Sequence, residues 1–257
     1  MLDILLTVVI ACFLALLTLA SVMLRVLTLY ASALAAIIGF VLFILGGVAY
    51  LALMVIFVVM GALVTSYHLK EKKEKRVSEA RGGQRGVKNV LAHAIVPLVL
   101  LSLFVLDPAL LGPEGAAPFI FMSALAFAAA DNFASEIGVL ADHARSIVGW
   151  EKVPSGTDGG ISLIGEMAAL CGSALISSIG AAAFILTGTQ LALPVVEWVL
   201  TCTALGWVGC QLDSVAGATI ERRQLVGKSS VNLIAMLATA IIAFVTLGVL
   251  NMFGVLA

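Results

Sequence analysis

The sequence has little charge for its length. Lys, Arg, Asp and Glu make up 11% of its 257 residues, whereas 62% are hydrophobic. A soluble domain typically has about a quarter of its residues charged, so this composition excludes an ordinary soluble fold and indicates a lipid environment. The formal net charge is -1 and the basic residues are confined to a few segments. A nucleic-acid partner is therefore not indicated.

Several signatures of enzymes and metal sites are missing. The four cysteines lie in apolar stretches without CxxC or Cys/His spacing, which favours packing over metal binding. No GxGxxG, HExxH or GxSxG motif occurs. The segment Gly227-Lys228-Ser229 resembles the end of a phosphate-binding loop, but Arg222 stands where that motif needs its first glycine. Function must therefore be sought among the polar residues of the membrane segments.

Long apolar runs are abundant. A helix needs about 20 apolar residues to cross the hydrocarbon core, and charged or Gly/Pro-rich breaks separate eight such runs. The first run lacks a basic N-terminal region, so it is interpreted as a retained helix and not as a signal peptide. The sequence therefore predicts one all-α, polytopic membrane helix bundle over residues 1–257, with a tight hairpin at Gly46-Gly47. The predicted spans are about 2–24, 27–45, 47–67, 89–106, 116–138, 161–187, 192–211 and 231–253.

The charge distribution predicts the orientation. With the loop after the third span in the cytoplasm, all 14 Lys and Arg residues fall on the cytoplasmic side. This separation obeys the positive-inside rule and predicts that both termini are non-cytoplasmic. The predicted cytoplasmic loops are about 68–88, 139–160 and 212–230. A Lys/Glu stretch at 70–79 either sets the topology beside anionic lipid or attracts an anionic substrate.

The fifth predicted span carries a polar segment at its cytoplasmic end. Ionisable groups in a span cost roughly 2.5 to 3.5 kcal/mol on insertion scales, so they mark candidate sites. Asp131, Asn132, Ser135 and Glu136 lie on two adjacent stripes of a helix. Carboxylates at a hydrated helix end are suitable Mg2+ ligands when substrate phosphates complete the coordination. The alternative is hydrogen bonding between neighbouring helices.

A glycine-rich segment, 151–162, precedes the sixth predicted span. Its proline and glycines delay helix formation, and the free N–H groups at the start of the next helix can hold phosphate. Lys152 is a candidate countercharge, with Thr157 and Ser162 as candidate donors. The alternative is a plain connecting turn.

The seventh predicted span leads into a second acidic segment. Asp213 and Gly217 share one side of a helix. The segment is similar to the one around Asp131, although the identity is too slight to establish an internal repeat. Arg222 and Arg223 are interpreted as anchors at the membrane interface.

Four motifs occur in order along the chain. They are RGGQR at 81–85, ADNFASEIG at 130–138, GTDGGISLIG at 156–165 and DSVAGA at 213–218. Together they resemble the transmembrane protein 19 family, also called domain of unknown function 92, which includes phytyl-phosphate kinase. The resemblance covers nearly the whole chain. It implies phosphoryl transfer from a nucleoside triphosphate, CTP in the related prenol kinases, to a prenyl monophosphate, which gives the diphosphate.

The resemblance also implies roles for particular residues. Phosphoryl transfer needs positioning and charge neutralisation more than a covalent nucleophile. Mg2+ is expected on Asp131, Glu136 and Asp213, which form the expected catalytic set together with Lys152. Arg81 and Arg85 are expected to hold the acceptor monophosphate. The other expected substrate contacts are Asn132, Ser135, Gly156, Thr157, Gly159, Gly160, Ser162, Ser214 and Gly217.

A small-solute or ion transporter is the alternative function, because eight spans with acidic residues and glycine breaks can also form a transport path. A transporter is expected to bind its substrate near the bilayer midplane, whereas the polar groups here gather at cytoplasmic helix ends. This placement favours the enzyme. The expected location is the plasma membrane of a prokaryote, with membrane lipid and a prenyl phosphate as partners.

Overall fold

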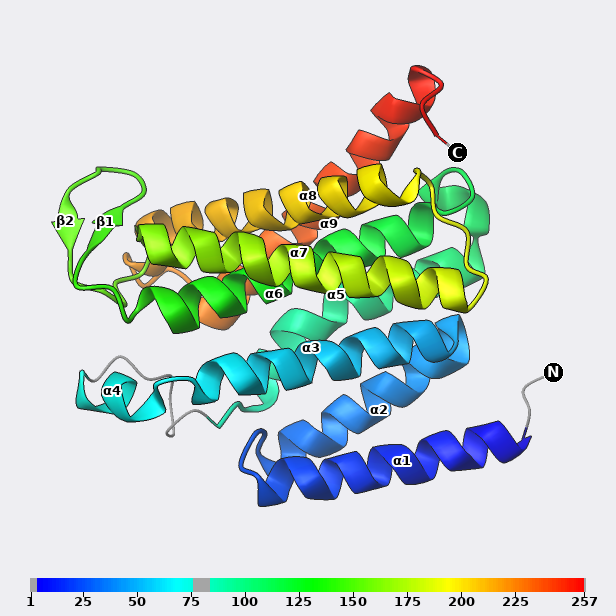
Figure 1. Cartoon of the computed structure of the whole chain (residues 1–257), viewed down its shortest axis with the longest axis horizontal. Helices are drawn as coiled ribbons and strands as arrows, with labels where there is room; N and C mark the ends of the chain where they lie inside the picture. The colour runs from blue at the N-terminus through cyan, green and yellow to red at the C-terminus, as the bar shows by residue number, and fades with distance from the viewer. Residues whose placement is uncertain (1–3, 76–83, 257) are drawn as a thin grey trace.

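The computed structural model describes residues 4–75 and 84–256. Within them, eight helices are long and apolar enough to cross a membrane, which confirms the predicted number of spans. The chain folds as a polytopic membrane helix bundle (Figure 1). Its long helices are α1 (Ile4–Met23), α2 (Leu29–Gly46), α3 (Val48–Ser66), α5 (Val87–Leu106), α6 (Ala116–Gly138), α7 (Leu163–Leu186), α8 (Val195–Ala216) and α9 (Lys228–Met252).

Shorter elements connect these spans. The predicted hairpin at Gly46-Gly47 is present, because Gly47 joins α2 to α3 with a φ of 84°, which glycine adopts without strain. Beyond α3 and α5 lie α4 (Leu69–Glu74) and the 3-10 helix η2 (Pro108–Leu111). The predicted seventh span runs past residue 211, since α8 continues through the acidic segment into a π-helical turn, η3 (Gly217–Glu221).

A small antiparallel sheet lies between α6 and α7, where the sequence predicted only a loop. Strand β1 (Ala144–Ser146) pairs with β2 (Lys152–Val153) and with β3 (Gly160–Ile161), in the order β2-β1-β3. The strands are only two or three residues long. They are therefore too short for a period-2 pattern to reveal them in the sequence.

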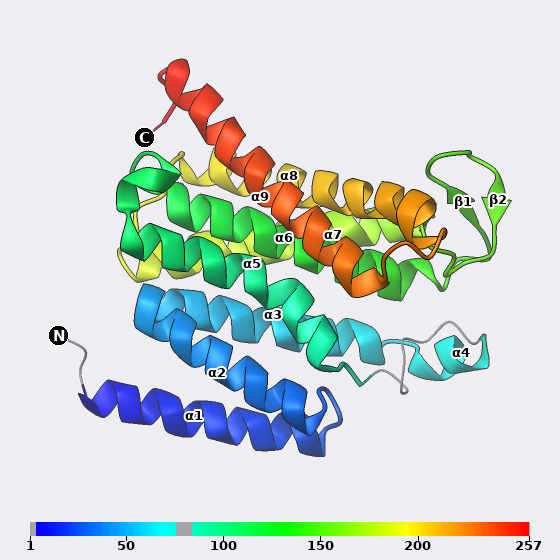
Figure 2. The same ribbon diagram turned by 180° about the vertical axis from the view of Figure 1, so that it is seen from behind.

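Helix α6 is the centre of the bundle. It packs against α3, α5, α7, α8 and α9 (Figures 1 and 2), and nearly all of its residues are buried. Glycines on the partner helices allow this close approach: a Cβ at Gly172 of α7 would lie 2.9 Å from the carbonyl oxygen of Ala129, and one at Gly206 of α8 would lie 2.7 Å from the carbonyl carbon of Ala126. Helix α1, in contrast, packs against α2 at the periphery.

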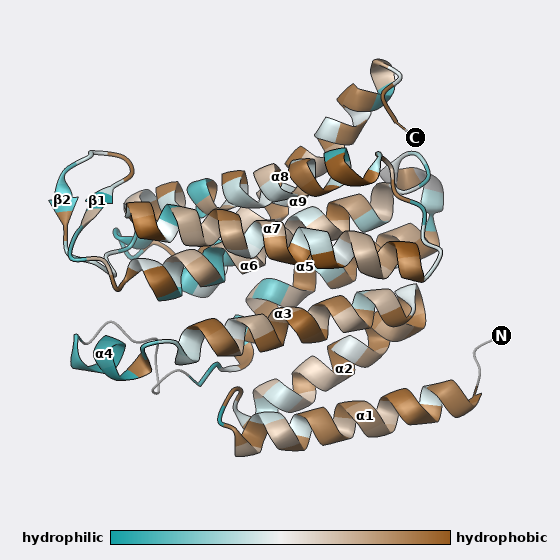
Figure 3. Cartoon of the chain, in the orientation of Figure 1, coloured by the Kyte–Doolittle hydropathy of each residue, from teal (hydrophilic) through white to brown (hydrophobic). Residues whose placement is uncertain are grey.

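Polar residues gather at one end of the bundle, called the polar end below. It comprises the last turns of α3, α6 and α8, the first turns of α5, α7 and α9, and the sheet and α4 beside them (Figure 3). The first turn of α1 and the last turn of α9 lie at the opposite end (Figure 1). The polar end is where the membrane helices meet the charged connections.

Candidate functional site

A cavity of about 160 Å³ at the polar end brings the acidic and glycine-rich segments together. Pockets that enclose a drug-sized ligand usually measure about 300 to 1,000 Å³. This cavity therefore has room for a phosphate group and a metal ion but not for a whole nucleotide. The sequence-predicted residues that line it are Asp131, Ser135, Glu136, Gly156, Thr157, Gly159, Gly160, Ser162, Asp213, Ser214 and Gly217.

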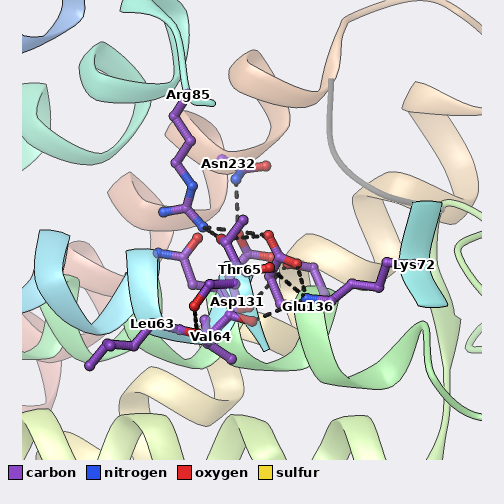
Figure 4. Close-up of polar contacts among 11 residues, drawn as sticks. Leu63, Val64, Thr65, Lys72, Arg85, Asp131, Glu136 and Asn232 are labelled. Carbon is purple, nitrogen blue, oxygen red and sulfur yellow. Dashed lines mark hydrogen bonds and ion pairs between the residues drawn. The ribbon is translucent and has the colours of Figure 1, made fainter. Parts of the chain in front are cut away.

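Two carboxylates from different helices face this cavity. Asp131 of α6 and Asp213 of α8 lie close enough for their charges to interact. Asp131 Oδ2 accepts a hydrogen bond from Asn232 Nδ2 of α9 at 3.0 Å (Figure 4). Asp213 Oδ1 is buried and has no hydrogen-bond donor among residues 4–75 and 84–256. Because an unpartnered buried carboxylate oxygen is costly, Asp213 marks a position for an added ligand.

The donor set fits a divalent cation that arrives with phosphate. Mg2+ is usually held by one or two carboxylates, with waters and substrate phosphates as its other ligands. Asp131 and Asp213 supply two carboxylates, and Asp213 Oδ1 has no competing donor in the described part of the chain. The same part contains no group of three or more His, Cys, Asp or Glu residues that could hold a metal ion. A metal here would therefore need phosphate oxygens to complete its coordination.

Glu136 has a different environment from these two acids. Its Oε2 accepts a hydrogen bond from Lys72 Nζ at 2.7 Å. Its Oε1 accepts one from Thr65 Oγ1 at 2.6 Å and lies 3.9 Å from Arg85 Nη2 (Figure 4). Both oxygens of this buried carboxylate are engaged. In this arrangement the charge of Glu136 neutralises buried cations, and its expected role as a Mg2+ ligand stays a prediction.

Three expected site residues, Lys152, Arg85 and Asn132, do not line the cavity. A fourth, Arg81, falls outside the described residues. Lys152 is exposed on β2 and does not line the cavity. Arg85 and Asn132 are buried next to Gly61, whose missing side chain leaves room for the guanidinium. The expected contacts of these three residues with substrate phosphate stay predictions.

Four residues that line the cavity were not among the expected site residues: Asp158, Glu166, Glu221 and Lys228. Six of the lining residues are acidic, and Lys228 is the basic one. Lys228, the first residue of α9, brings to the cavity the positive charge that was expected from Lys152. In the sequence, Lys228 is the last charged residue before the eighth apolar run, and this position could have indicated that it lies at the membrane end of the last helix. The excess of carboxylates means that a phosphate group must enter together with cations.

Glu166 has a structural task at this cavity. Its Oε2 accepts hydrogen bonds from Trp207 Nε1 and Gln211 Nε2, both at 2.8 Å. These contacts link the first turn of α7 to α8. These part-buried hydrogen bonds therefore hold the two walls of the cavity together.

The glycine-rich loop lies directly against the end of α8. Gly159 has a φ of 69°, and a Cβ there would collide with Ala218 and approach the Ser214 carbonyl oxygen to 2.5 Å. From the other side, a Cβ at Gly217 would lie 3.0 Å from the Gly159 nitrogen. Gly217 also begins the π-helical turn η3, and π turns within helices are frequent at functional sites. Two glycines thus bring two backbones into contact at the cavity wall.

The hydroxyl groups expected to bind phosphate have partners within the loop. Ser162 caps α7, because its Oγ accepts from Gly165 N at 3.2 Å and donates to the Gly138 carbonyl oxygen at 3.4 Å. Thr157 Oγ1 donates to the Pro154 carbonyl oxygen at 2.7 Å. In this arrangement these hydroxyls shape the loop.

Comparison with known proteins identifies the family. A family profile described as integral membrane protein DUF92 matches residues 12–240. An uncharacterized membrane protein of Methanocaldococcus jannaschii is 35% identical over 209 residues, which cover 80% of this chain and 79% of the relative. An uncharacterized membrane protein of Synechocystis is 28% identical over 186 residues, covering 70% of this chain and 66% of the relative. No solved structure matches significantly. The predicted resemblance is confirmed, and the chain belongs to the DUF92 family of integral membrane proteins.

Proposed function

We propose that the protein is a membrane phosphotransferase that moves a phosphoryl group from a nucleoside triphosphate to a prenyl monophosphate, giving the diphosphate. One observation carries this proposal: Asp131, Asp213 and the glycine-rich loop line one cavity at the polar end of a membrane bundle. The donor is CTP by analogy with the related prenol kinases. The identity of the acceptor rests on the family resemblance, since a prenyl chain can remain in the bilayer while its phosphate reaches the helix ends.

The residues of the cavity suit positioning and charge neutralisation, the main requirements of phosphoryl transfer. Asp131 and Asp213 would hold Mg2+, which supplies charge neutralisation when it is bound. The start of α7 offers the positive end of a helix dipole beside the glycine-rich loop. Lys228 interacts electrostatically with Asp213 and brings positive charge to the same wall.

The acceptor phosphate requires a basic partner, and Arg85 remains the candidate. Its Nη2 donates to Thr65 Oγ1 at 3.1 Å and faces Glu136 in this structure. Binding of the acceptor at Arg85 would therefore require an exchange of these partners. The polar end is rich in Lys and Arg, so we place it in the cytoplasm of a prokaryotic cell, with the protein in the plasma membrane.

A transporter for divalent cations is the second candidate, and the excess of carboxylates in the cavity favours it. Cation transport would use the same two aspartates but would need neither a nucleotide nor a phosphate. The position of the cavity at the helix ends favours the phosphotransferase, because transport sites usually lie near the bilayer midplane.

The protein purified in detergent is expected to form prenyl diphosphate when it is given CTP or ATP, Mg2+ and phytyl or geranylgeranyl phosphate. The product should be absent when Mg2+ is removed, because the acidic cavity would repel an uncomplexed triphosphate. Chromatography of the labelled lipid measures the reaction. Lack of product with every nucleotide and acceptor, together with Mn2+ uptake by proteoliposomes, would reject the phosphotransferase in favour of the transporter.

A further inference from the structure

Lys72 is a wholly buried lysine on the short helix α4, which lies outside the eight spans. Its neighbours Lys70, Lys73 and Lys75 are exposed. A buried ammonium is unstable unless it is paired and fully hydrogen-bonded. Lys72 Nζ meets this condition, because it donates to the carbonyl oxygens of Val64 and Thr65, both at 3.1 Å, and to Glu136 Oε2 at 2.7 Å. Its three N–H groups have three acceptors.

These acceptors place Lys72 between two helix ends. The carbonyl groups of Val64 and Thr65 belong to the last turn of α3, where the helix dipole is negative. Glu136 belongs to the last turn of α6. One ammonium group therefore joins α4, α3 and the helix that carries Asp131 (Figure 4).

Arg85 reaches the same carboxylate from the other end of the segment that connects α3 to α5. Its side chain contacts Thr65 and Glu136 as described above. Its backbone N donates to the Val26 carbonyl oxygen, and its carbonyl oxygen accepts from Thr28 N, both at 3.0 Å. The turn between α1 and α2 is thus tied to the residue that contacts Glu136.

We propose that Lys72 is a positioning residue for the candidate site. Its ion pair with Glu136 holds the polar end of α6 so that Asp131 faces Asp213 across the cavity. Lys72 does not line the cavity, so it acts through Glu136, which lies on the same helix as Asp131 and does line the cavity. The role of the cavity as a reaction site rests on the proposed function, whereas the coupling of Lys72 to α6 does not.

A second lysine of the same region provides a matched control. Lys75 Nζ lies 2.9 Å from Glu71 Oε1, with side chains 40% and 41% exposed. The hydrogen bond from Lys75 lowers the pKa of the Glu71 carboxyl, but both groups remain in solvent. Exposed pairs of this kind contribute little to stability. Replacing Lys75 therefore removes a lysine, this salt bridge and a hydrogen bond of 3.4 Å to the Leu140 carbonyl oxygen, which lies beyond the end of α6, but leaves Glu136 and its partners in place.

The test compares Lys72→Met with Lys75→Met in the full-length protein, using Mn2+ as the probe. Lys72→Met is expected to weaken Mn2+ binding about tenfold, as loss of outer-shell support does at metal sites, and to lower kcat about 100-fold. Lys75→Met should match the wild type in both. The double variant Lys72→Met/Glu136→Gln should bind Mn2+ no more weakly than Glu136→Gln alone, because Lys72 acts through Glu136. Wild-type Mn2+ affinity and turnover in Lys72→Met would overturn the proposal.

Hydrogen–deuterium exchange separates this proposal from the phosphotransferase itself. Amides of residues 131–138 should exchange faster in Lys72→Met than in Lys75→Met, whatever reaction the protein catalyses. Unchanged exchange would overturn the positioning role. If these amides exchange faster in Lys72→Met but the wild type binds no Mn2+, the positioning role is supported and the proposed function is not. If Lys72→Met does not accumulate, Thr65→Val removes the other donor to Glu136 and should raise the same exchange.

Discussion

Asp213→Asn is expected to lower turnover with nucleoside triphosphate, Mg2+ and prenyl phosphate by at least about 100-fold, a typical loss when a charge-stabilising group is removed from an active site. The protein should nevertheless fold. Asp213 Oδ1 has no hydrogen-bond donor in the described part of the chain, and the attraction of Asp213 to Lys228 is smaller than its repulsion by Asp131. Asp131 and Asp213 repel each other when no cation lies between them. The substitution removes that repulsion, so the stability of the metal-free protein should be unchanged or higher.

Thermal unfolding in detergent, with and without Mn2+, measures both effects. A ligand that binds the native state raises its unfolding temperature, so Mn2+ should stabilise the wild type and fail to stabilise Asp213→Asn. Glu197→Gln is the matched control, because Glu197 is an exposed acid in the first turn of the same helix, at the opposite end of the bundle. Stabilisation of Asp213→Asn by Mn2+ to the wild-type extent would show that the cation is held elsewhere.

Gly159→Ala is expected to abolish activity and to destabilise the protein. Gly159 and Gly188 have nearly the same φ, 69° and 72°. They differ in their surroundings. A methyl group at Gly188 meets nothing within 4 Å, whereas one at Gly159 collides with Ala218 and with the backbone of η3. Gly188→Ala should therefore cost about 1–2 kcal/mol of left-handed strain, and Gly159→Ala should add about 1–3 kcal/mol of overpacking.

The comparison of these two variants isolates the contact between the loop and η3. Unfolding temperatures and turnover should both fall further in Gly159→Ala, because the loop must move away from η3 and leave the cavity open. Equal losses in the two variants would mean that backbone strain alone matters and that the close approach at η3 has no role.

The membrane spans could be predicted because each is a long apolar run with clear breaks, and lipid leaves few alternatives to helix. The approach of Asp131 to Asp213 was predictable in outline, since both lie at the polar ends of their helices. The ion pair of Glu136 with Lys72 could not be predicted from the sequence. Lys72 lies in a Lys/Glu stretch that is typical of a solvated segment, and only tertiary packing shows that one of those lysines is buried. The position of Lys152 could not be predicted for a similar reason, because the pairing of β2 with β1 leaves its side chain exposed and away from the cavity.

Because the chain is synthesised from its N-terminus, the contacts of α6 become available in a fixed order. The counter-ions of Glu136 precede it in the chain, so Lys72 and Arg85 are already made when α6 enters the membrane. Asn232, which donates to Asp131, is made only with the last helix. The glutamate can therefore be neutralised during insertion. The contact of Asp131 with Asn232 forms only after α9 is made, and Lys228 of α9 also lines the cavity, so the cavity is completed only when the last helix has been inserted.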